Sequence, residues 1–250
     1  METLLLKLRL LLVTWLHLGS RPGSVHLLKQ FSYKDIKKAT NGFRTVQFLG
    51  RLHHRHIAAL CGFSTGRKRF LVFENLERGS LKDHLSDPLK TPLNWRTRLE
   101  IAVGVAAALE YLHFFCNPPV YYVSINSSTI MLDENFIPKL SETSLLSATE
   151  NTDQIGNNTI FQLGLLILEL VTGQSSVGGG ADLVHWVRES HVPRSLNKMI
   201  DPDLGNEYDS RELKGLLSVA RLCIDSVDNS SKYTSQILRY LKTKASPPTE

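Results

Sequence analysis

One run of twelve residues, Ile160 to Val171 (IFQLGLLILELV), constrains the fold of this 250-residue chain more than any other segment. The run is apolar on nearly every face of a helix, and at this length it is too short to cross a lipid bilayer. A helix of this kind is stable in water when other elements cover it on all sides. The sequence therefore predicts a central helix inside a mainly helical domain.

Helical periodicity elsewhere predicts the elements that cover this central helix. From Asn94 to Phe115 the apolar residues recur at helical spacing, and Asn94 is the predicted N-cap. The residues predicted to share one face of this helix are Leu99, Ala102, Ala106, Leu109 and Leu112. Further helices are predicted over residues 183–187, 212–223 and 234–241.

Two short strands are predicted near the front of the chain. The apolar runs 57–61 and 70–73 flank Gly62 and the polar stretch STGRK, as the two strands of a hairpin do. A small strand-containing front followed by a mostly helical back indicates an α+β fold.

Charge and cysteine content argue against two classes of protein. The net charge is +5, but the basic residues are scattered, which is not typical of a nucleic-acid binder. Cys61, Cys116 and Cys223 are far apart and each stands beside apolar residues, so we predict buried free thiols and no disulfide framework or zinc site. The run HHRH at 53–56 is interpreted as a structural turn, because a metal site needs converging ligands.

The N-terminal residues leave several alternatives open. An apolar stretch from Leu10 to Leu18 follows Lys7 and Arg9 and is too short to span a membrane. It fits the core of a signal peptide, an interfacial membrane segment or the remainder of a lost transmembrane helix. Membrane contact through residues 1–20 and secretion by a signal-like leader therefore both stay open.

Several segments, taken in order, resemble the intracellular domain of plant receptor-like serine/threonine protein kinases of the Pelle type. These segments are FSYKDIKKATNGF (31–43), LHHRHIAALCGF (52–63), RFLVFENLERGSLKDHL (69–85), NWRTRLEIAVGVAAALEYLHFFCNPP (94–119), LELVTG (168–173), DPDL (201–204) and LLSVARLCI (216–224). Each segment is a weak signal alone, but their common order over most of the chain implies the protein-kinase fold. Activity still depends on the residues of the site.

The stretch 118–136, PPVYYVSINSSTIMLDENF, resembles the kinase catalytic loop running into a β-hairpin whose turn holds Asp133. In active members this loop carries His-Arg-Asp, then a lysine that steadies the γ-phosphate and an asparagine that binds Mg²⁺. A serine at the aspartate place cannot act as a base at neutral pH without its own activator. The residues at these five places are, in order, Tyr122, Val123, Ser124, Asn126 and Thr129.

Other functional places of the family are also altered. Glu142, Thr143 and Ser144 stand where the family has Asp-Phe-Gly, and the extra methylene of a glutamate displaces the carboxylate that Mg²⁺ needs in strict octahedral geometry. Eight residues, 43–50, stand where active kinases have the glycine-rich loop, the strand-3 lysine and helix C. Thr45 is assigned to the place of the helix-C glutamate.

Two further parts of the family pattern are reduced. Thr159, at the place of the family's helix-F aspartate, follows Glu142 after a shortened activation segment. Ser231 stands near the place of the arginine that pairs with the family's Ala-Pro-Glu motif, which is also missing. The hinge-like residues that remain of the nucleotide cradle are Phe73, Glu74, Asn75 and Leu76.

These observations predict a kinase-like α+β fold with a truncated N-lobe lacking strands 1–3 and a mainly helical C-lobe. The predicted limits are 1–30 for the leader and linker, 31–42 for a pre-kinase segment, 43–75 for the N-lobe, 76–245 for the C-lobe and 246–250 for a tail.

The resemblance implies a catalytically inactive pseudokinase that acts as a protein-interaction or regulatory module in plant kinase signalling. We expect a protein partner, with an active receptor-like kinase as the candidate, and no nucleic acid, cofactor or metal. The expected location is the cytoplasm, with the plasma membrane left open. The alternatives are an atypical Ser/Thr protein kinase with residual ATP binding, and a decaying product without a stable fold.

Overall fold

The computed structural model describes residues 48–63, 71–121, 123–146, 159–176, 180–189, 199–205, 207–226 and 234–245. The chain divides into two units, and a boundary between them falls after Asn75. The described parts of the first unit are 48–53, 58–63 and 71–75, and the second unit contains His54–Ile57 and everything from Leu76 onward that is described. The domain limits given above stay predictions.

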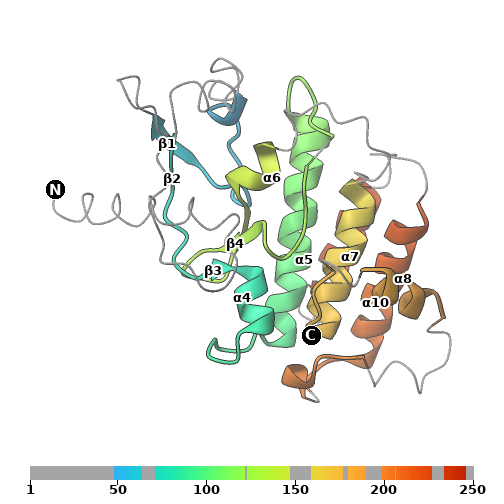
Figure 1. Ribbon diagram of the computed structural model, residues 1–250. Coiled ribbons are helices and arrows are strands. Elements are labelled where there is room, and N and C mark those ends of the chain that lie inside the picture. The colour runs from blue at the N-terminus through green and yellow to red at the C-terminus, as the bar shows by residue number, and fades with distance from the viewer. Residues whose placement is uncertain are drawn as a thin grey trace, which may run out of the picture. The chain divides into compact units, whose positions relative to one another are not determined.

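The first unit contains a two-stranded antiparallel sheet. Strand β1 (Leu60–Phe63) pairs with β2 (Leu71–Phe73), so the predicted pairing of the two front strands is confirmed (Figure 1). The predicted turn between them lies outside the described residues. The predicted start of the first strand at Ile57 is wrong, because Ile57 forms a parallel bridge with Leu140 inside the second unit.

The cysteine prediction is partly wrong. All three cysteines are free thiols, and Cys223 is buried, but Cys116 is half-buried and Cys61 is exposed. The register of β1 shifts between Leu60 and Gly62, and a residue in such a bulge has no cross-strand partner to cover it. Cys61 is therefore left at the surface of the small sheet.

The second unit carries a three-stranded antiparallel sheet in the order β3 (Gly79–Ser80), β4 (Ile130–Leu132) and β5 (Pro138–Leu140). Between β4 and β5, Oδ1 of Asp133 accepts hydrogen bonds from the backbone N–H groups of Asn135 and Ile137. Aspartate stabilises turns in this way, which confirms the predicted turn role of Asp133.

Helices make up most of the second unit (Figure 1). Asn94 accepts a hydrogen bond from the N–H of Thr97 and so caps α5 as predicted. The helix continues through Phe115, but its last five residues form a π-helical turn. The helices are α4 (Leu81–Ser86), α5 (Trp95–Glu110), α6 (Glu142–Leu146), α7 (Thr159–Thr172), α8 (Gly180–Glu189), α10 (Ser210–Asp225) and α11 (Thr234–Ala245), with a 3₁₀ turn at Pro202–Leu204.

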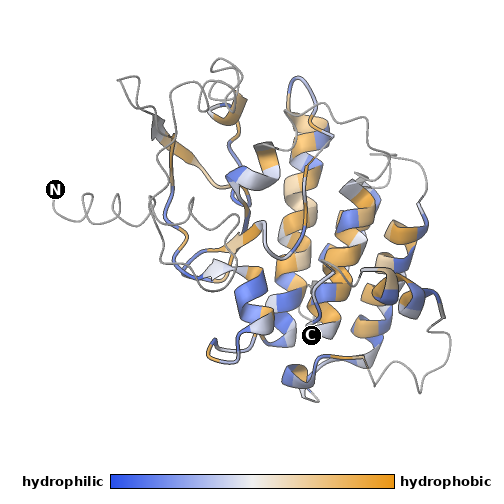
Figure 2. Cartoon of the chain, viewed as in Figure 1, coloured by the Kyte–Doolittle hydropathy of each residue, from blue (hydrophilic) through white to orange (hydrophobic). Residues whose placement is uncertain are grey.

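Helix α7 is the predicted central helix, and it begins and ends within one residue of the apolar run. It packs between α5 and α10 (Figure 1), and α11 also packs against α5. Apolar residues extend along α7 and also cover much of α5 (Figure 2). Most of the side chains of α7 are buried, as the absence of a polar face requires. Within the described part of the chain, no helix combines the length and the hydropathy needed to cross a membrane.

A close contact between α7 and α10 gives a first test of the packing. A Cβ atom on Gly164 would lie 2.9 Å from the carbonyl oxygen of Ala220 and 2.9 Å from Cβ of Cys223. We expect Gly164→Ala to lower the free energy of unfolding by about 1–3 kcal/mol, because the extra methyl group overpacks the helix crossing. Urea unfolding followed by circular dichroism measures this change.

Gly180→Ala is the matched control for that measurement. Gly180 is also helical, but its added Cβ would meet Leu165 at an ordinary 3.8 Å. The control should leave stability unchanged or slightly raised. Equal stability of the two variants would show that α7 and α10 do not approach as closely as described.

Candidate functional site

The catalytic-loop-like segment is held against α7 by side chains of that helix. The Thr159 hydroxyl donates a hydrogen bond of 2.7 Å to the carbonyl oxygen of Tyr121. Three α7 side chains then accept from alternate backbone N–H groups of the loop. These contacts are Val123 N to Thr159 Oγ1 (3.5 Å), Ile125 N to Gln162 Oε1 (2.7 Å) and Ser127 N to Glu169 Oε2 (2.9 Å). The threonine at the family's helix-F aspartate place thus still contacts this segment.

This anchoring decides which side of the loop each residue faces. The residues whose N–H groups bond to α7, namely Val123, Ile125 and Ser127, are buried. Ser124 and Asn126 alternate with them and are half-buried. Ser124 and Asn126, which stand at the places of the family's base and lysine, therefore lie on the more accessible side of the segment. Tyr122 and Thr45 lie outside the described residues.

The Thr129 side chain closes the loop on itself. Its hydroxyl accepts from the N–H of Asn126 at 3.1 Å and lies 3.1 Å from the carbonyl oxygens of Ser124 and Asn126. A hydroxyl has one proton to donate, and a backbone carbonyl takes it here. A metal ion at this hydroxyl would have to displace these contacts.

The Asn126 side chain is engaged in the same way. Its Oδ1 accepts from the N–H groups of Ser128 at 2.9 Å and Thr129 at 3.2 Å. This is an Asx turn, which holds the chain direction locally. An amide held in this way cannot supply the positive charge that a lysine brings to the γ-phosphate.

The segment at the Asp-Phe-Gly place forms the start of α6 and is bonded to the loop. The hydroxyl of the fully buried Ser144 donates to the carbonyl oxygen of Thr129 at 3.1 Å, and the backbone carbonyl oxygen of Ser144 accepts from the N–H of Ser124 at 3.1 Å. The hydroxyls of Ser141 and Thr143 lie 2.7 Å apart. The structure therefore brings Ser124, Asn126, Thr129 and Ser144 together in one hydrogen-bonded unit.

Glu142 is the acidic residue at the start of α6, two positions before Ser144. Burial raises the pKa of its carboxyl group, and a hydrogen bond from its own backbone opposes that effect. A raised pKa makes ionisation of this carboxyl group less favourable than in an exposed glutamate, and Mg²⁺ binds ionised carboxylates. Among the described residues, no group of three or more His, Cys, Asp or Glu side chains is placed to hold a metal ion.

The hinge-like residues continue the ladder of the small sheet in the first unit. Phe73 is buried at the end of β2. Glu74 donates from its N–H to the carbonyl oxygen of Ala59 at 2.9 Å, and its Oε1 accepts from the N–H of Ala59 at 2.8 Å. Asn75 is the last residue of the first unit, and Leu76 belongs to the second unit.

The HHRH turn makes structural contacts, as predicted. His56 Nδ1 lies 3.0 Å from the carbonyl oxygen of Pro138, and His54 stacks on Tyr111 with ring centroids 5.0 Å apart. Burial is the main reason that the pKa of His56 is lowered to about 4. Both contacts tie residues 54–57 to the core of the second unit.

A buried ion pair was missed by the sequence analysis. Arg98 of α5 donates to Oδ2 of Asp201 at 2.7 Å and to the carbonyl oxygens of Leu93 and Leu170. The side chains are 1% and 8% exposed. The available signals were an arginine inside an apolar helical pattern and an aspartate directly before a proline. No short-range sequence pattern indicates that these two residues form a pair. Ser231, at the place of the other family arginine, lies outside the described residues.

Comparisons with known proteins identify the family of this chain. The family model described as "Protein tyrosine and serine/threonine kinase" matches residues 20–172. A probable receptor-like protein kinase of Arabidopsis thaliana is 36% identical over 90% of this chain and 39% of its own length. The probable serine/threonine-protein kinase PBL7 of the same plant is 31% identical over 88% of this chain and 67% of its length. The chain thus spans between two fifths and two thirds of these two relatives.

Solved structures show the same fold. The pseudokinase domain of BIR2, described as an immune regulator of the RLK/Pelle family, matches with a TM-score of 0.68 and 25% identity over 86% of this chain and 70% of that one. The pseudokinase DRIK1 matches in fold with a TM-score of 0.70 and 23% identity over 87% of this chain and 80% of its own. The chain therefore has the protein-kinase fold and belongs to the protein tyrosine and serine/threonine kinase family.

Proposed function

We propose that this chain is a non-catalytic, kinase-like regulatory module that binds a protein partner in receptor-kinase signalling. The observation that carries the proposal is the closed hydrogen bonding of Thr129 and Asn126. Both residues stand at places where an active kinase presents side chains to Mg²⁺ and the γ-phosphate. Here their side chains form hydrogen bonds with the backbone of their own loop.

The other chemical roles lack suitable groups. Ser124 has the place of the base, and a serine hydroxyl does not accept a proton at neutral pH without an activator. Glu142 has the place of the metal-binding aspartate, and burial raises the pKa of its carboxyl group. In sequence, the segment 43–50 is too short for a glycine-rich loop, a strand with its lysine, and helix C. Phosphoryl transfer depends on positioning and charge stabilisation from all of these parts.

A regulatory role is supported by the solved structures that share the fold. BIR2 is described as an immune regulator, and its pseudokinase domain is similar to this chain over most of its length. We infer a protein partner, with an active receptor-like kinase as the candidate, and a place in the cytoplasm where such a kinase domain works. The proposal includes no cofactor, metal or nucleic acid.

ATP binding tests the proposal directly. We expect calorimetry and thermal shift to show weak or no binding of ATP, with no dependence on Mg²⁺, because the groups that would hold phosphate and metal are absent or engaged. Adenosine without phosphates is the control for contacts through the hinge-like residues. A dissociation constant in the low micromolar range that requires Mg²⁺ would contradict the proposal.

Restoring the family residues separates lost side chains from lost architecture. We expect the quadruple variant Ser124→Asp, Asn126→Lys, Thr129→Asn, Glu142→Asp to show no phosphoryl transfer, because nothing opposite these groups would hold the phosphates. Radiolabel transfer to a generic substrate is compared with a reaction lacking protein and with the triple variant that keeps Ser124. Circular dichroism confirms that the variants are folded. Activity clearly above both controls would show that the site retains a working geometry.

A further inference from the structure

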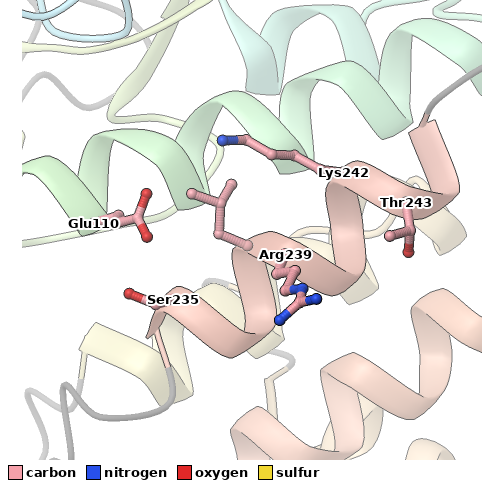
Figure 3. A pocket seen from close by; sticks show the side chains of 6 residues that line it. Glu110, Ser235, Arg239, Lys242 and Thr243 are labelled. Atoms are coloured by element: carbon pink, nitrogen blue, oxygen red, sulfur yellow. The ribbon is translucent and has the colours of Figure 1, made fainter.

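A cavity of about 310 Å³ lies between α5 and α11, and none of its lining residues belongs to the catalytic-loop segment. Glu110 contributes from α5, and the remaining lining residues come from α11 (Figure 3). Glu110 and Ser235 lie at one end of the cavity, and Lys242 and Thr243 lie at the other (Figure 3). The residues that line it are Glu110, Ser235, Leu238, Arg239, Lys242 and Thr243. We call this cavity and its rim the α5–α11 groove.

The groove is apolar at its base and polar at its rim. Leu238 is 2% exposed and belongs to the core, whereas Arg239 and Lys242 are exposed. The hydroxyl of Thr243 donates to the carbonyl oxygen of Tyr240 and can still accept a hydrogen bond. Two cations, hydroxyl groups and one carboxylate therefore surround the cavity.

Positive charge extends beyond the cavity. Burial is the largest cause of the lowered pKa of His54. The positive charges of Arg55, Lys139 and Lys242 lower the pKa further. These three cations must therefore lie close enough to His54 to act on it together. His54 stacks on Tyr111, the residue that follows Glu110. The positive charge of Lys242, which lines the groove, thus acts on His54 in the 54–57 turn.

The sequence of α11 adds to this charge. Helix α11 contains three basic residues and no aspartate or glutamate, while Glu110 of α5 is the carboxylate at the groove. A surface with an excess of positive charge attracts oppositely charged partners and speeds their association. The groove therefore fits an anionic occupant.

Exposed aromatic residues follow Glu110 at the end of α5. Phe114 and Phe115 belong to the π-helical turn Tyr111–Phe115, which begins directly after Glu110. Phe114 is 49% exposed and Phe115 is 72% exposed. Exposed aromatic side chains are typical anchors of protein–protein interfaces. An occupant with both acidic and apolar side chains matches this surface.

We propose that the α5–α11 groove docks an acidic peptide segment of a protein partner, whose carboxylates pair with Arg239 and Lys242. This inference deepens the proposed function, on which it rests, by naming the surface and the chemistry of the partner. Glu110 in the wall can accept hydrogen bonds from the backbone N–H groups that a peptide carries.

Fluorescence anisotropy with defined probes tests this assignment. The probes are a short labelled peptide of glutamate and leucine, the same peptide with glutamine for glutamate, and vesicles of phosphatidylcholine with phosphatidylglycerol. The full chain is compared with Arg239→Glu/Lys242→Glu and with the control Lys90→Glu/Lys214→Glu. Lys90 and Lys214 are exposed outside the groove, and the control changes the net charge by the same amount.

We expect the acidic peptide to bind and the groove variant to weaken binding by about tenfold or more, while the control stays within about twofold. Lys242→Gln is a milder variant that should weaken binding by about threefold without placing new negative charge on α11. Proton NMR gives a reading at the site itself. The bound carboxylates should raise the pKa of His54 toward its ordinary value.

Several results would overturn the assignment. These are equal losses in the two double variants, equal binding of the glutamine peptide, an unmoved His54 titration, or vesicle binding through Arg239 and Lys242 without peptide binding. The assay is independent of nucleotide. If the chain binds neither ATP nor the acidic peptide, this inference is wrong and the proposed function stands. If the chain turns over ATP and also binds the peptide at the groove, the proposed function is wrong.

Discussion

Arg98→Ala is expected to lower the free energy of unfolding by about 3–5 kcal/mol, which is a large share of the stability of an ordinary domain. The substitution leaves the carboxylate of Asp201 buried without its cation. It also removes the donors to the carbonyl oxygens of Leu93 and Leu170. Breaking one side of a buried pair is costly because the remaining charge has lost both water and partner.

Arg96→Ala is the matched control for this substitution. Arg96 lies on the same helix and forms an ion pair of 2.9 Å with Glu100, but both side chains are about half exposed. An exposed pair of this spacing contributes about 0.3–0.5 kcal/mol. Urea unfolding monitored by tryptophan fluorescence compares the two variants.

The double variant Arg98→Ala/Asp201→Ala completes the cycle. It should be less destabilising than the sum of the single variants, because no unpaired charge remains. If Arg98→Ala costs no more than Arg96→Ala, the Arg98–Asp201 pair does not stabilise the fold in the way described.

Glu169→Ala is the second substitution with a large expected effect. The fully buried carboxylate accepts from the N–H of Ser127, and from both the N–H and the hydroxyl of Ser176. A hydrogen bond to a charged group contributes about 1.5–3 kcal/mol, so we expect the loss of these three bonds to cost about 3 kcal/mol or more. The catalytic-loop segment should lose its attachment to α7 at the same time.

Glu169→Gln tests the geometry of these contacts. Oε2 accepts from Ser127 and Oε1 accepts from Ser176, whereas a glutamine offers one oxygen and one donor. One of the two sides is then lost, so the cost should fall between those of the wild type and Glu169→Ala.

Hydrogen exchange measures, at individual residues, whether the catalytic-loop segment has lost its attachment to α7. The amide of Ser127 should exchange much faster in Glu169→Ala, while that of Ile125, bonded to Gln162, should change less. Unchanged protection of Ser127 would show that Glu169 does not hold the loop.

Local patterns were sufficient for much of the fold. The apolar run 160–171 requires burial on all sides and is the central helix α7, and Asn94 caps α5 because an asparagine before a helix satisfies its first N–H groups. The hairpin turn at Asp133 was predictable for the same reason, since its contacts lie within four residues. Helix ends were less accurate. Helices α8, α10 and α11 all extend beyond the predicted ranges, because packing continues a helix past its periodic core.

Contacts between distant residues were decided by the tertiary structure. The sequence determined which family places hold Ser124, Asn126, Thr129 and Glu142, but not that Thr129 and Asn126 bond to their own loop or that α7 holds it through Thr159, Gln162 and Glu169. Arg98 and Asp201 are 103 positions apart, and no periodic pattern links residues across that distance. Periodicity reports which residues are buried, since burial follows from side-chain polarity along one element. The partner of a buried polar group depends on how several elements pack together, and only the folded chain determines that.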